Sequence, residues 1–249
     1  MSTPSVRSTR AVPHRVVVTD VPRPPIDRLD ALSVYGVATV HEALGRVGYL
    51  GPEIRPIQQG ARIAGSAVTA LCWPGDNLMI HAAVEQCAPG DILVVATTSP
   101  NADGLFGELL ATSLVAHGVR GLVMDAGVRD TQELRAMGFP VWTRHVSAQG
   151  SVKASAGAVN VPVVVGGHTV HPGSVVLADD DGVMTLPARD LEHALTASTA
   201  REAKEEATRE ALAGGQLGLD RYNLRPALKD LGVEYVSYDE YRSLERDDG

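Results

Sequence analysis

Short runs of hydrophobic residues, separated by Gly, Pro and Asp, dominate the middle of the chain. Ile92–Ala96 and Gly121–Met124 are continuous apolar runs, which is typical of strands buried on both faces. Arg62–Cys72 alternates small and apolar residues and predicts another strand. Ser174–Ala178 and Val183–Leu186 flank an Asp-rich turn and predict a hairpin. Further strands are predicted at 16–19, 140–142, 161–165 and 233–236.

Helical periodicity alternates with these runs. The segment 107–117 places Leu109, Leu110 and Leu114 on one side and ends at Gly118. Residues 188–213 form the longest helical pattern, alanine-rich on one face and charged on the other. Shorter helices are predicted at 26–33, 77–87, 131–137 and 226–231, and a capping box at 39–42 predicts one more. No linker divides the chain, so we predict one α/β domain with a helical C-terminal arm, which we expect to pack on a neighbouring subunit.

Charge and composition narrow the class of protein. The 249 residues carry a formal net charge of -8, so long-range attraction to nucleic acid or anionic lipid is not expected. An anionic ligand must therefore be held locally. No apolar run has the length of a signal peptide or a bilayer span, and we expect a cytoplasmic protein. We expect a disordered leader over 1–15 and a loose, charged tail over 237–249. The two cysteines, Cys72 and Cys87, read as small buried residues.

Acidic residues stand where elements begin in the stretch from Gly107 to Asp130. Asp130 precedes a predicted helix, and Asp is a favoured N-cap residue. It is also a suitable ligand for a hard divalent cation, which takes few carboxylates and keeps several waters. Glu108 would be the second acid, holding those waters. The pattern alone leaves both interpretations of Asp130 open.

The same stretch offers groups that bind an anion. Arg129 could pair with a surface acid, or its guanidinium could hold a carboxylate through two parallel hydrogen bonds. The helix start after Gly107 presents free backbone amides and the positive end of the helix dipole. A divalent metal beside an anionic 2-oxo acid is the chemistry that this stretch favours.

Other candidate sites are weaker. His168 and His171 suggest zinc, but they lie in a turn and no third ligand is evident. The run Asp179–Asp181 suggests calcium, although a solvated hairpin turn is the simpler interpretation. There are only three lysines, and none lies in an apolar strand. A Schiff-base mechanism needs a desolvated lysine, so a carbon–carbon lyase of this composition would use a metal.

Several motifs, in order along the chain, resemble the RraA-like family and within it the class II pyruvate aldolases. They are Gly60–Thr69, Pro74–Asn77, Gly107–Ala111, Gly127–Asp130, Ala178–Val183 and Leu217–Asp220. The segments Thr39–Ala43, Met79–His81 and Val84–Cys87 look closest to the branch that cleaves 4-carboxy-4-hydroxy-2-oxoadipate. The resemblance covers residues 16–236.

The resemblance implies a fold, an assembly and a set of site residues. The fold would be an αββα sandwich of the swivelling-domain type over 16–187, with an arm over 188–236, assembled as homotrimers or homohexamers. Asp130 would bind Mg²⁺ or Mn²⁺ directly and Glu108 through water. Arg129 and the backbone of Gly107, Glu108, Leu109 and Leu110 would bind the substrate. Glu205 from a neighbouring arm would position water, and Glu202 and Glu206 are alternatives to it.

The resemblance also implies a reaction. It would be the metal-dependent retro-aldol cleavage of 4-carboxy-4-hydroxy-2-oxoadipate to pyruvate and oxaloacetate, in the catabolism of aromatic compounds. Side activities on 4-hydroxy-4-methyl-2-oxoglutarate and in oxaloacetate decarboxylation would accompany it. The alternatives are a non-catalytic regulator that binds an RNA-degrading enzyme, as RraA itself does, and a dedicated oxaloacetate decarboxylase. No nucleic-acid or membrane partner is expected.

Overall fold

The computed structural model describes residues 15–247, and the chain divides into two compact units, Met1–Thr199 and Ala200–Gly249. The strands are β1 Val16–Val17, β2 Arg55–Pro56, β3 Ile63–Cys72, β4 Asp91–Thr97, β5 Gly104–Phe106, β6 Gly121–Val128, β7 Val141–Val146, β8 Ala158–Val159, β9 Val163–Val165, β10 His168–Val170, β11 Val175–Asp179 and β12 Gly182–Leu186. The α-helices are α1 Ile26–Ser33, α2 Val37–Ala43, α3 Leu78–Val84, α4 Glu108–Ala116, α5 Thr131–Ala136, α6 Leu191–Ala213, α7 Gly218–Arg221, α8 Arg225–Asp230 and α9 Tyr238–Asp247, and a 3-10 turn, η1 Ala188–Asp190, precedes α6.

Parallel strands form the centre of the first unit. Strands β3, β4, β6 and β7 are neighbours in that order, and all three pairings are parallel. Strand β5 adds a short parallel pairing to the end of β6. The antiparallel hairpin β11–β12 pairs with the first half of β3, while β9 and β10 form a separate ribbon. Parallel strands end at the same edge of a sheet, which is where ligands bind in many α/β proteins.

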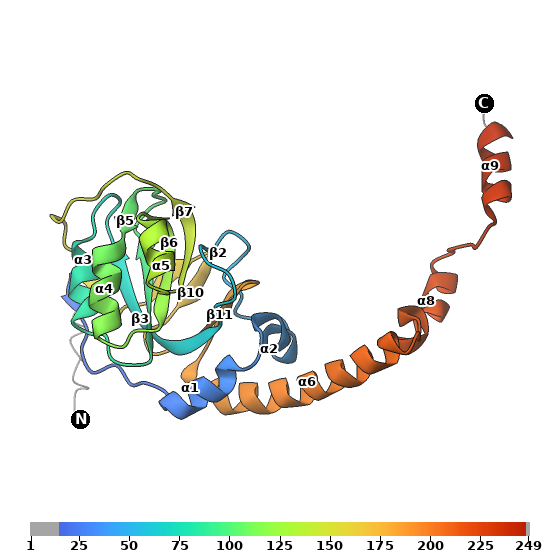
Figure 1. Cartoon of the computed structure of the whole chain (residues 1–249), viewed down its shortest axis with the longest axis horizontal. Helices are drawn as coiled ribbons and strands as arrows, with labels where there is room; N and C mark the ends of the chain where they lie inside the picture. The colour runs from blue at the N-terminus through green and yellow to red at the C-terminus, as the bar shows by residue number, and fades with distance from the viewer. Residues whose placement is uncertain (1–14, 248–249) are drawn as a thin grey trace, which may run out of the picture. The chain divides into compact units, whose positions relative to one another are not determined.

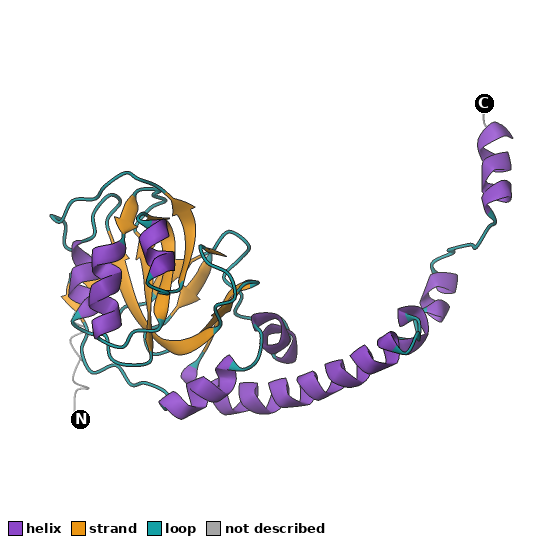
Figure 2. Cartoon of the chain, viewed as in Figure 1, coloured by secondary structure: helices purple, strands orange, loops and turns teal. Residues whose placement is uncertain are grey.

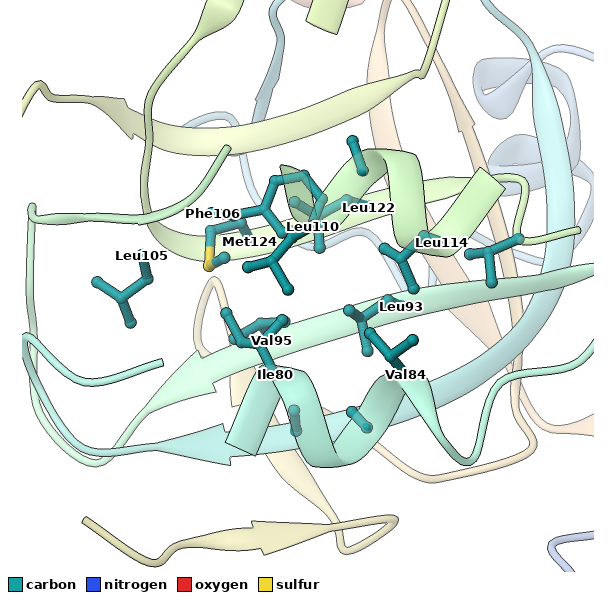
Figure 3. Close-up of a cluster of buried hydrophobic side chains, with 14 of the residues drawn as sticks. Ile80, Val84, Leu93, Val95, Leu105, Phe106, Leu110, Leu114, Leu122 and Met124 are labelled. Atoms are coloured by element: carbon teal, nitrogen blue, oxygen red, sulfur yellow. The ribbon is translucent and has the colours of Figure 1, made fainter. Parts of the chain in front are cut away.

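Three hydrophobic clusters separate four layers of secondary structure. Helices α3, α4 and α5 cover one face of the parallel strands, and side chains such as Ile80, Leu93 and Leu114 fill that interface (Figures 1 and 3). The opposite face packs on β9 to β12 around Trp142 and Val176. Helices α1, α2 and the first turns of α6 cover β11 and β12 from outside. Figure 2 shows helices on both flanks of the strands. The predicted αββα architecture is confirmed.

Strand β3 takes part in all three interfaces. Ala64 belongs to the outer helical cluster, Ala67 to the cluster between the β layers, and Val68, Ala70 and Cys72 to the cluster under α3 and α4. Its residues can do this because the strand is long and side chains alternate between its faces. The small residues at these positions let each layer approach closely.

Most predicted elements are confirmed, but several expectations are wrong. Leu109 is 78% exposed and does not share the buried side of α4 with Leu110 and Leu114. The predicted turn at 168–171 begins with strand β10, His168–Val170. Helix α2 begins at Val37, so the capping box at 39–42 does not mark its start. Residues 233–236 form no strand. The tail that was expected to be loose contains helix α9, Tyr238–Asp247. The run Asp179–Asp181 is not simply a solvated turn. The expected leader lies outside the described residues, apart from residue 15.

Asp179 is a buried structural acid. Its Oδ2 accepts a hydrogen bond from the N–H of Val37 at 2.9 Å, and its Oδ1 accepts one from the N–H of Asp181 at 2.9 Å. It therefore caps helix α2 from a strand far away in sequence, where Gly36 has no side chain to do so. Both carboxylate oxygens of Asp179 thus accept backbone hydrogen bonds, so this side chain has a structural role.

Candidate functional site

Two chain segments meet where β5 and β6 end. The strands run parallel with Phe106 opposite Val128, so the residues that follow them are brought side by side. The N–H of Arg129 donates to the carbonyl oxygen of Phe106 at 2.8 Å and fixes this arrangement. Glu108 thus lies beside Asp130 although they are 22 residues apart.

Asp130 has an unusual backbone for a residue with a side chain. Its φ and ψ are 55° and 38°, the left-handed region that Asp tolerates better than most residues. It precedes α5 as predicted, but it makes no capping bond to that helix. Its Oδ2 instead accepts the N–H of Glu108, the first residue of α4, at 3.1 Å. The interpretation of Asp130 as the side-chain cap of its own helix is therefore wrong.

Gly107 leaves the space that this contact needs. A Cβ atom on Gly107 would lie 2.2 Å from Oδ2 of Asp130 and 3.1 Å from Cγ of Arg129. Its φ of -158° is ordinary extended backbone, so glycine is needed here for close approach and not for an unusual conformation. Because residue 107 has no side chain, the carboxylate of Asp130 can reach the first N–H of α4.

The other predicted groups surround Asp130. The side chain of Arg129 is 45% exposed, with Nε 3.6 Å from Oδ2 of Asp130, so much of its guanidinium fork faces solvent. Glu108 accepts a hydrogen bond from the hydroxyl of Thr112 at 3.0 Å. The N–H of Glu108 is engaged by Asp130, whereas no hydrogen bond of the described residues uses the N–H of Leu109 or Leu110. Those two N–H groups lie in the first turn of α4, at the positive end of the helix dipole, where an anion is stabilised.

Glu205 belongs to the second unit. It lies on α6 and accepts a hydrogen bond from Nε of Arg201, one turn earlier, at 2.6 Å. Glu206 pairs with Arg209, and Glu202 is exposed. The first unit alone therefore holds Glu108, Arg129 and Asp130 but not the complete predicted set.

The donor chemistry at Asp130 suits a hard divalent cation. Its side chain is 38% exposed, the N–H of Glu108 donates to Oδ2, and no hydrogen bond within residues 15–247 engages Oδ1. No group of three or more His, Cys, Asp or Glu side chains is arranged for a metal in that range. A cation on Asp130 would thus keep water or substrate oxygens as most of its ligands, which Mg²⁺ favours.

The other candidates are explained by structure. His168 and His171 line a cavity of about 490 Å³ with His193 and Asp190, but no metal-binding group of the kind described forms among the residues 15–247. Asp125 is the remaining acid between Gly107 and Asp130. It lies within β6, where it pairs with Arg144 and accepts the N–H of Gly166 at 2.8 Å.

Both thiols are buried. Burial is the main cause that raises the pKa of Cys72 and of Cys87 to about 12. We therefore expect both thiols to be unreactive at neutral pH.

Sequence analysis overlooked the segment 147–157, which borders Arg129. The N–H of Gly104 donates to the carbonyl oxygen of Gln149 at 2.8 Å, and the N–H of Ser147 donates to that of Val128 at 2.9 Å. A Cβ atom on Gly150 would lie 3.5 Å from Nη1 of Arg129. The segment is a run of small and polar residues between two strands, and this composition was the feature of the sequence that could have indicated a loop near the site.

Comparison with known proteins places the site in context. The family model described as RraA-like, Aldolase/RraA, matches residues 37–185. A protein of Halalkalibacterium halodurans with the provisional name 4-hydroxy-4-methyl-2-oxoglutarate aldolase is 26% identical over 79% of this chain and 94% of its own length. One of Burkholderia multivorans with the same provisional name is 37% identical over 57% of this chain and 86% of its own length. The crystal structure of Streptomyces coelicolor RraAS2, titled an unusual member of the RNase ES inhibitor RraA protein family, superposes with a TM-score of 0.69 at 28% identity, over 76% of this chain and 98% of that one.

The helices offer no candidate for a membrane span. None that the structure describes combines the length and the apolar character that a bilayer crossing requires.

Proposed function

This chain belongs to the RraA-like, Aldolase/RraA, family, and from that premise we propose that it is a divalent-metal-dependent aldolase acting on 4-carboxy-4-hydroxy-2-oxoadipate. The observation that carries the proposal is the placement of Asp130. Its carboxylate is held at the first amide of α4, with Arg129 beside it. The provisional aldolase names of two relatives support the same class of reaction.

The residues would divide the work as follows. Asp130 would hold Mg²⁺ or Mn²⁺ directly and Glu108 through water, and the bound ion would supply Lewis-acid polarisation of the 2-oxo group. The guanidinium of Arg129 would bind the neighbouring carboxylate. The amides of Leu109 and Leu110 would stabilise the negative charge that develops on the 2-oxo oxygen.

The retro-aldol step then balances without a further reactant. A water held by Glu108 would accept the proton of the C4 hydroxyl while passing one of its own protons to the Glu108 carboxylate, and the C4–O bond would become a carbonyl as the C3–C4 bond breaks. The electron pair of that bond remains on the C3 fragment as pyruvate enolate. Protonation at C3 gives pyruvate, and the other fragment is oxaloacetate. The same stabilisation of an enolate would allow oxaloacetate decarboxylation and cleavage of 4-hydroxy-4-methyl-2-oxoglutarate.

A second copy of the chain completes the proposed site. We expect Glu205 of a neighbouring arm, or Glu202 or Glu206 beside it, to position the water. A homotrimer or homohexamer would provide this arrangement.

Pyruvate release tests the proposal. The purified protein is mixed with the substrate and Mg²⁺ or Mn²⁺, and pyruvate is followed through lactate dehydrogenase and NADH. Asp130→Asn should abolish turnover while retaining the fold, because Asn also tolerates the left-handed backbone. Glu133→Gln is the matched control, since it removes an exposed acid from the same helix three residues later. Full activity in excess chelator, or in Asp130→Asn, would contradict the metal mechanism.

The similarity to RraAS2 supports one alternative, a non-catalytic regulator of an RNA-degrading enzyme. Inhibition of a purified ribonuclease of the RNase ES type, without any pyruvate release, would favour it. The third candidate, a dedicated oxaloacetate decarboxylase, is distinguished by comparing kcat/KM for oxaloacetate and for the two aldol substrates. A higher value for oxaloacetate would favour it.

A further inference from the structure

The segment 147–157 borders Arg129, and a buried acid, Asp76, holds part of this segment in place. The segment 147–157 connects β7 to β8, and most of its residues are exposed. Its first part is fixed to β5 and β6 through Gln149 and Ser147, and Gly150 then passes the guanidinium of Arg129. Beyond Gly150 the segment depends on contacts with a different part of the fold.

Those contacts come from the turn at 74–77. The N–H of Val152 donates to the carbonyl oxygen of Gly75 at 2.9 Å, and the carbonyl oxygen of Val152 accepts the N–H of Asn77 at 3.0 Å. The Oδ2 atom of Asp76 accepts the N–H of Ala154 at 2.8 Å and that of Ser155 at 2.7 Å. The turn thus binds backbone groups of Val152, Ala154 and Ser155.

Asp76 is itself rigidly held. It is 2% exposed, and its Oδ1 accepts the N–H of Leu78, the first residue of α3, at 2.9 Å. A buried carboxylate that accepts amide N–H groups makes charge-assisted hydrogen bonds, which are stronger than those of a neutral acceptor. The side chain of Asn77 donates to the carbonyl oxygen of Leu105 in β5 at 2.8 Å, so the same turn also supports the strand that leads into Gly107.

We propose that Asp76 is a positioning residue for the substrate carboxylate, because it fixes the segment 147–157 against Arg129. The inference rests on the proposed function, in which Arg129 binds that carboxylate. Asp76 touches neither substrate nor metal; it acts through the segment. If it is lost, the backbone at Gly150 can move away from the guanidinium that it borders, and the two parallel hydrogen bonds to a carboxylate lose their geometry.

Two substitutions break the same contact from opposite sides. Asp76→Asn places an NH₂ donor either at Oδ2, where the N–H groups of Ala154 and Ser155 need an acceptor, or at Oδ1, where the N–H of Leu78 needs one. Ala154→Pro deletes one of those N–H groups and leaves the carboxylate intact. Asp91→Asn is the matched control: Asp91 is a fully buried acid that accepts the N–H of Ala88 at 2.8 Å, at the other end of the parallel strands from the site.

Hydrogen exchange and ligand binding are measured on the full chain at a temperature where circular dichroism shows each variant folded. Oxalate with Mg²⁺ serves as the probe, because it has the shape and charge of pyruvate enolate. Asp76→Asn and Ala154→Pro should speed exchange within 147–157 and raise the Kd for oxalate about tenfold, since misplacement of a binding group by an ångström has large effects. Their loss of kcat/KM should come mainly from KM. Asp91→Asn should change neither exchange in this segment nor oxalate binding.

The outcomes separate the two ideas. Faster exchange with unchanged oxalate binding and KM would show that Asp76 supports the fold alone and would overturn the positioning role. Unchanged exchange would overturn it as well. A wild-type protein that neither binds oxalate with Mg²⁺ nor releases pyruvate would overturn the proposed function first, and the inference with it.

Discussion

A methyl group at Gly107 should disable the site while leaving the fold intact. The Cβ of Gly107→Ala would lie 2.2 Å from Oδ2 of Asp130, so the carboxylate must retreat by about 1 Å to reach ordinary contact distance. That movement breaks the 3.1 Å hydrogen bond from the N–H of Glu108. The backbone itself accommodates alanine, since the φ of residue 107 is -158°.

The size of the effect follows from the displacement of the carboxylate. Misplacement of a binding or catalytic group by about 1 Å can cost about 100-fold in rate, so kcat/KM should fall about 10- to 100-fold. Stability should change by less than about 1 kcal/mol, because the side chain of Asp130 is partly exposed and can move into solvent.

Steady-state kinetics of pyruvate release and thermal unfolding measure the two quantities. Gly36→Ala is the control, since its Cβ would lie 3.4 Å from Oδ2 of Asp179, an ordinary contact. If Gly107→Ala kept wild-type kcat/KM, the placement of Asp130 at the start of α4 would not matter for the reaction. A large loss of stability without a specific loss of activity would point to folding as the role of this glycine.

Three further predictions concern the rest of the first unit. Asp179→Ala should lower the free energy of unfolding by about 1–3 kcal/mol, because it leaves the start of α2 uncapped. Thermal unfolding should show a melting temperature lower by about 2–4 °C for each kcal/mol, and Asp181→Ala is the control. Cys72 and Cys87, whose pKa burial raises to about 12, should not react with Ellman's reagent at pH 8 until the protein is unfolded; rapid labelling of the native protein would contradict this. Burial tends to raise the pKa of Asp76, but its backbone hydrogen bonds outweigh burial and hold that pKa below the ordinary value. The stabilisation of the fold by this carboxylate should therefore be present above the ordinary carboxyl pKa and be lost as the pH falls through the lowered pKa. Urea unfolding of Asp76→Asn should lack this part of the pH dependence.

The sequence predicts elements well where both faces are buried. The strands β4 and β6 are apolar runs because helices cover one face and the second β layer covers the other. Helix α1 is found where its residues predict it, and the hairpin β11–β12 surrounds the predicted turn. Strands β2 and β10, of two and three residues, are not predicted, whereas the equally short β1 and β9 lie within longer apolar runs that predict strands.

Two of the errors have a common physical cause, which is contact between distant parts of the chain. Helix α2 is capped by Asp179, 142 residues away, so no local motif marks its start. Asp130 is placed correctly before α5, but its hydrogen bond goes to Glu108 in another helix. The residues of the site could be chosen from their motifs, whereas the pairing between them depends on the register of β5 and β6.

Strand β3 has a consequence for cooperativity. Because its side chains belong to all three hydrophobic clusters, no layer of the first unit can separate without exposing residues of the other two. The amides of β3 should therefore exchange with solvent only when the whole unit unfolds, at a free energy equal to the global one. A scaffold that opens in this all-or-none manner holds the ends of its parallel strands still, and the site at those ends stays preorganised between turnovers.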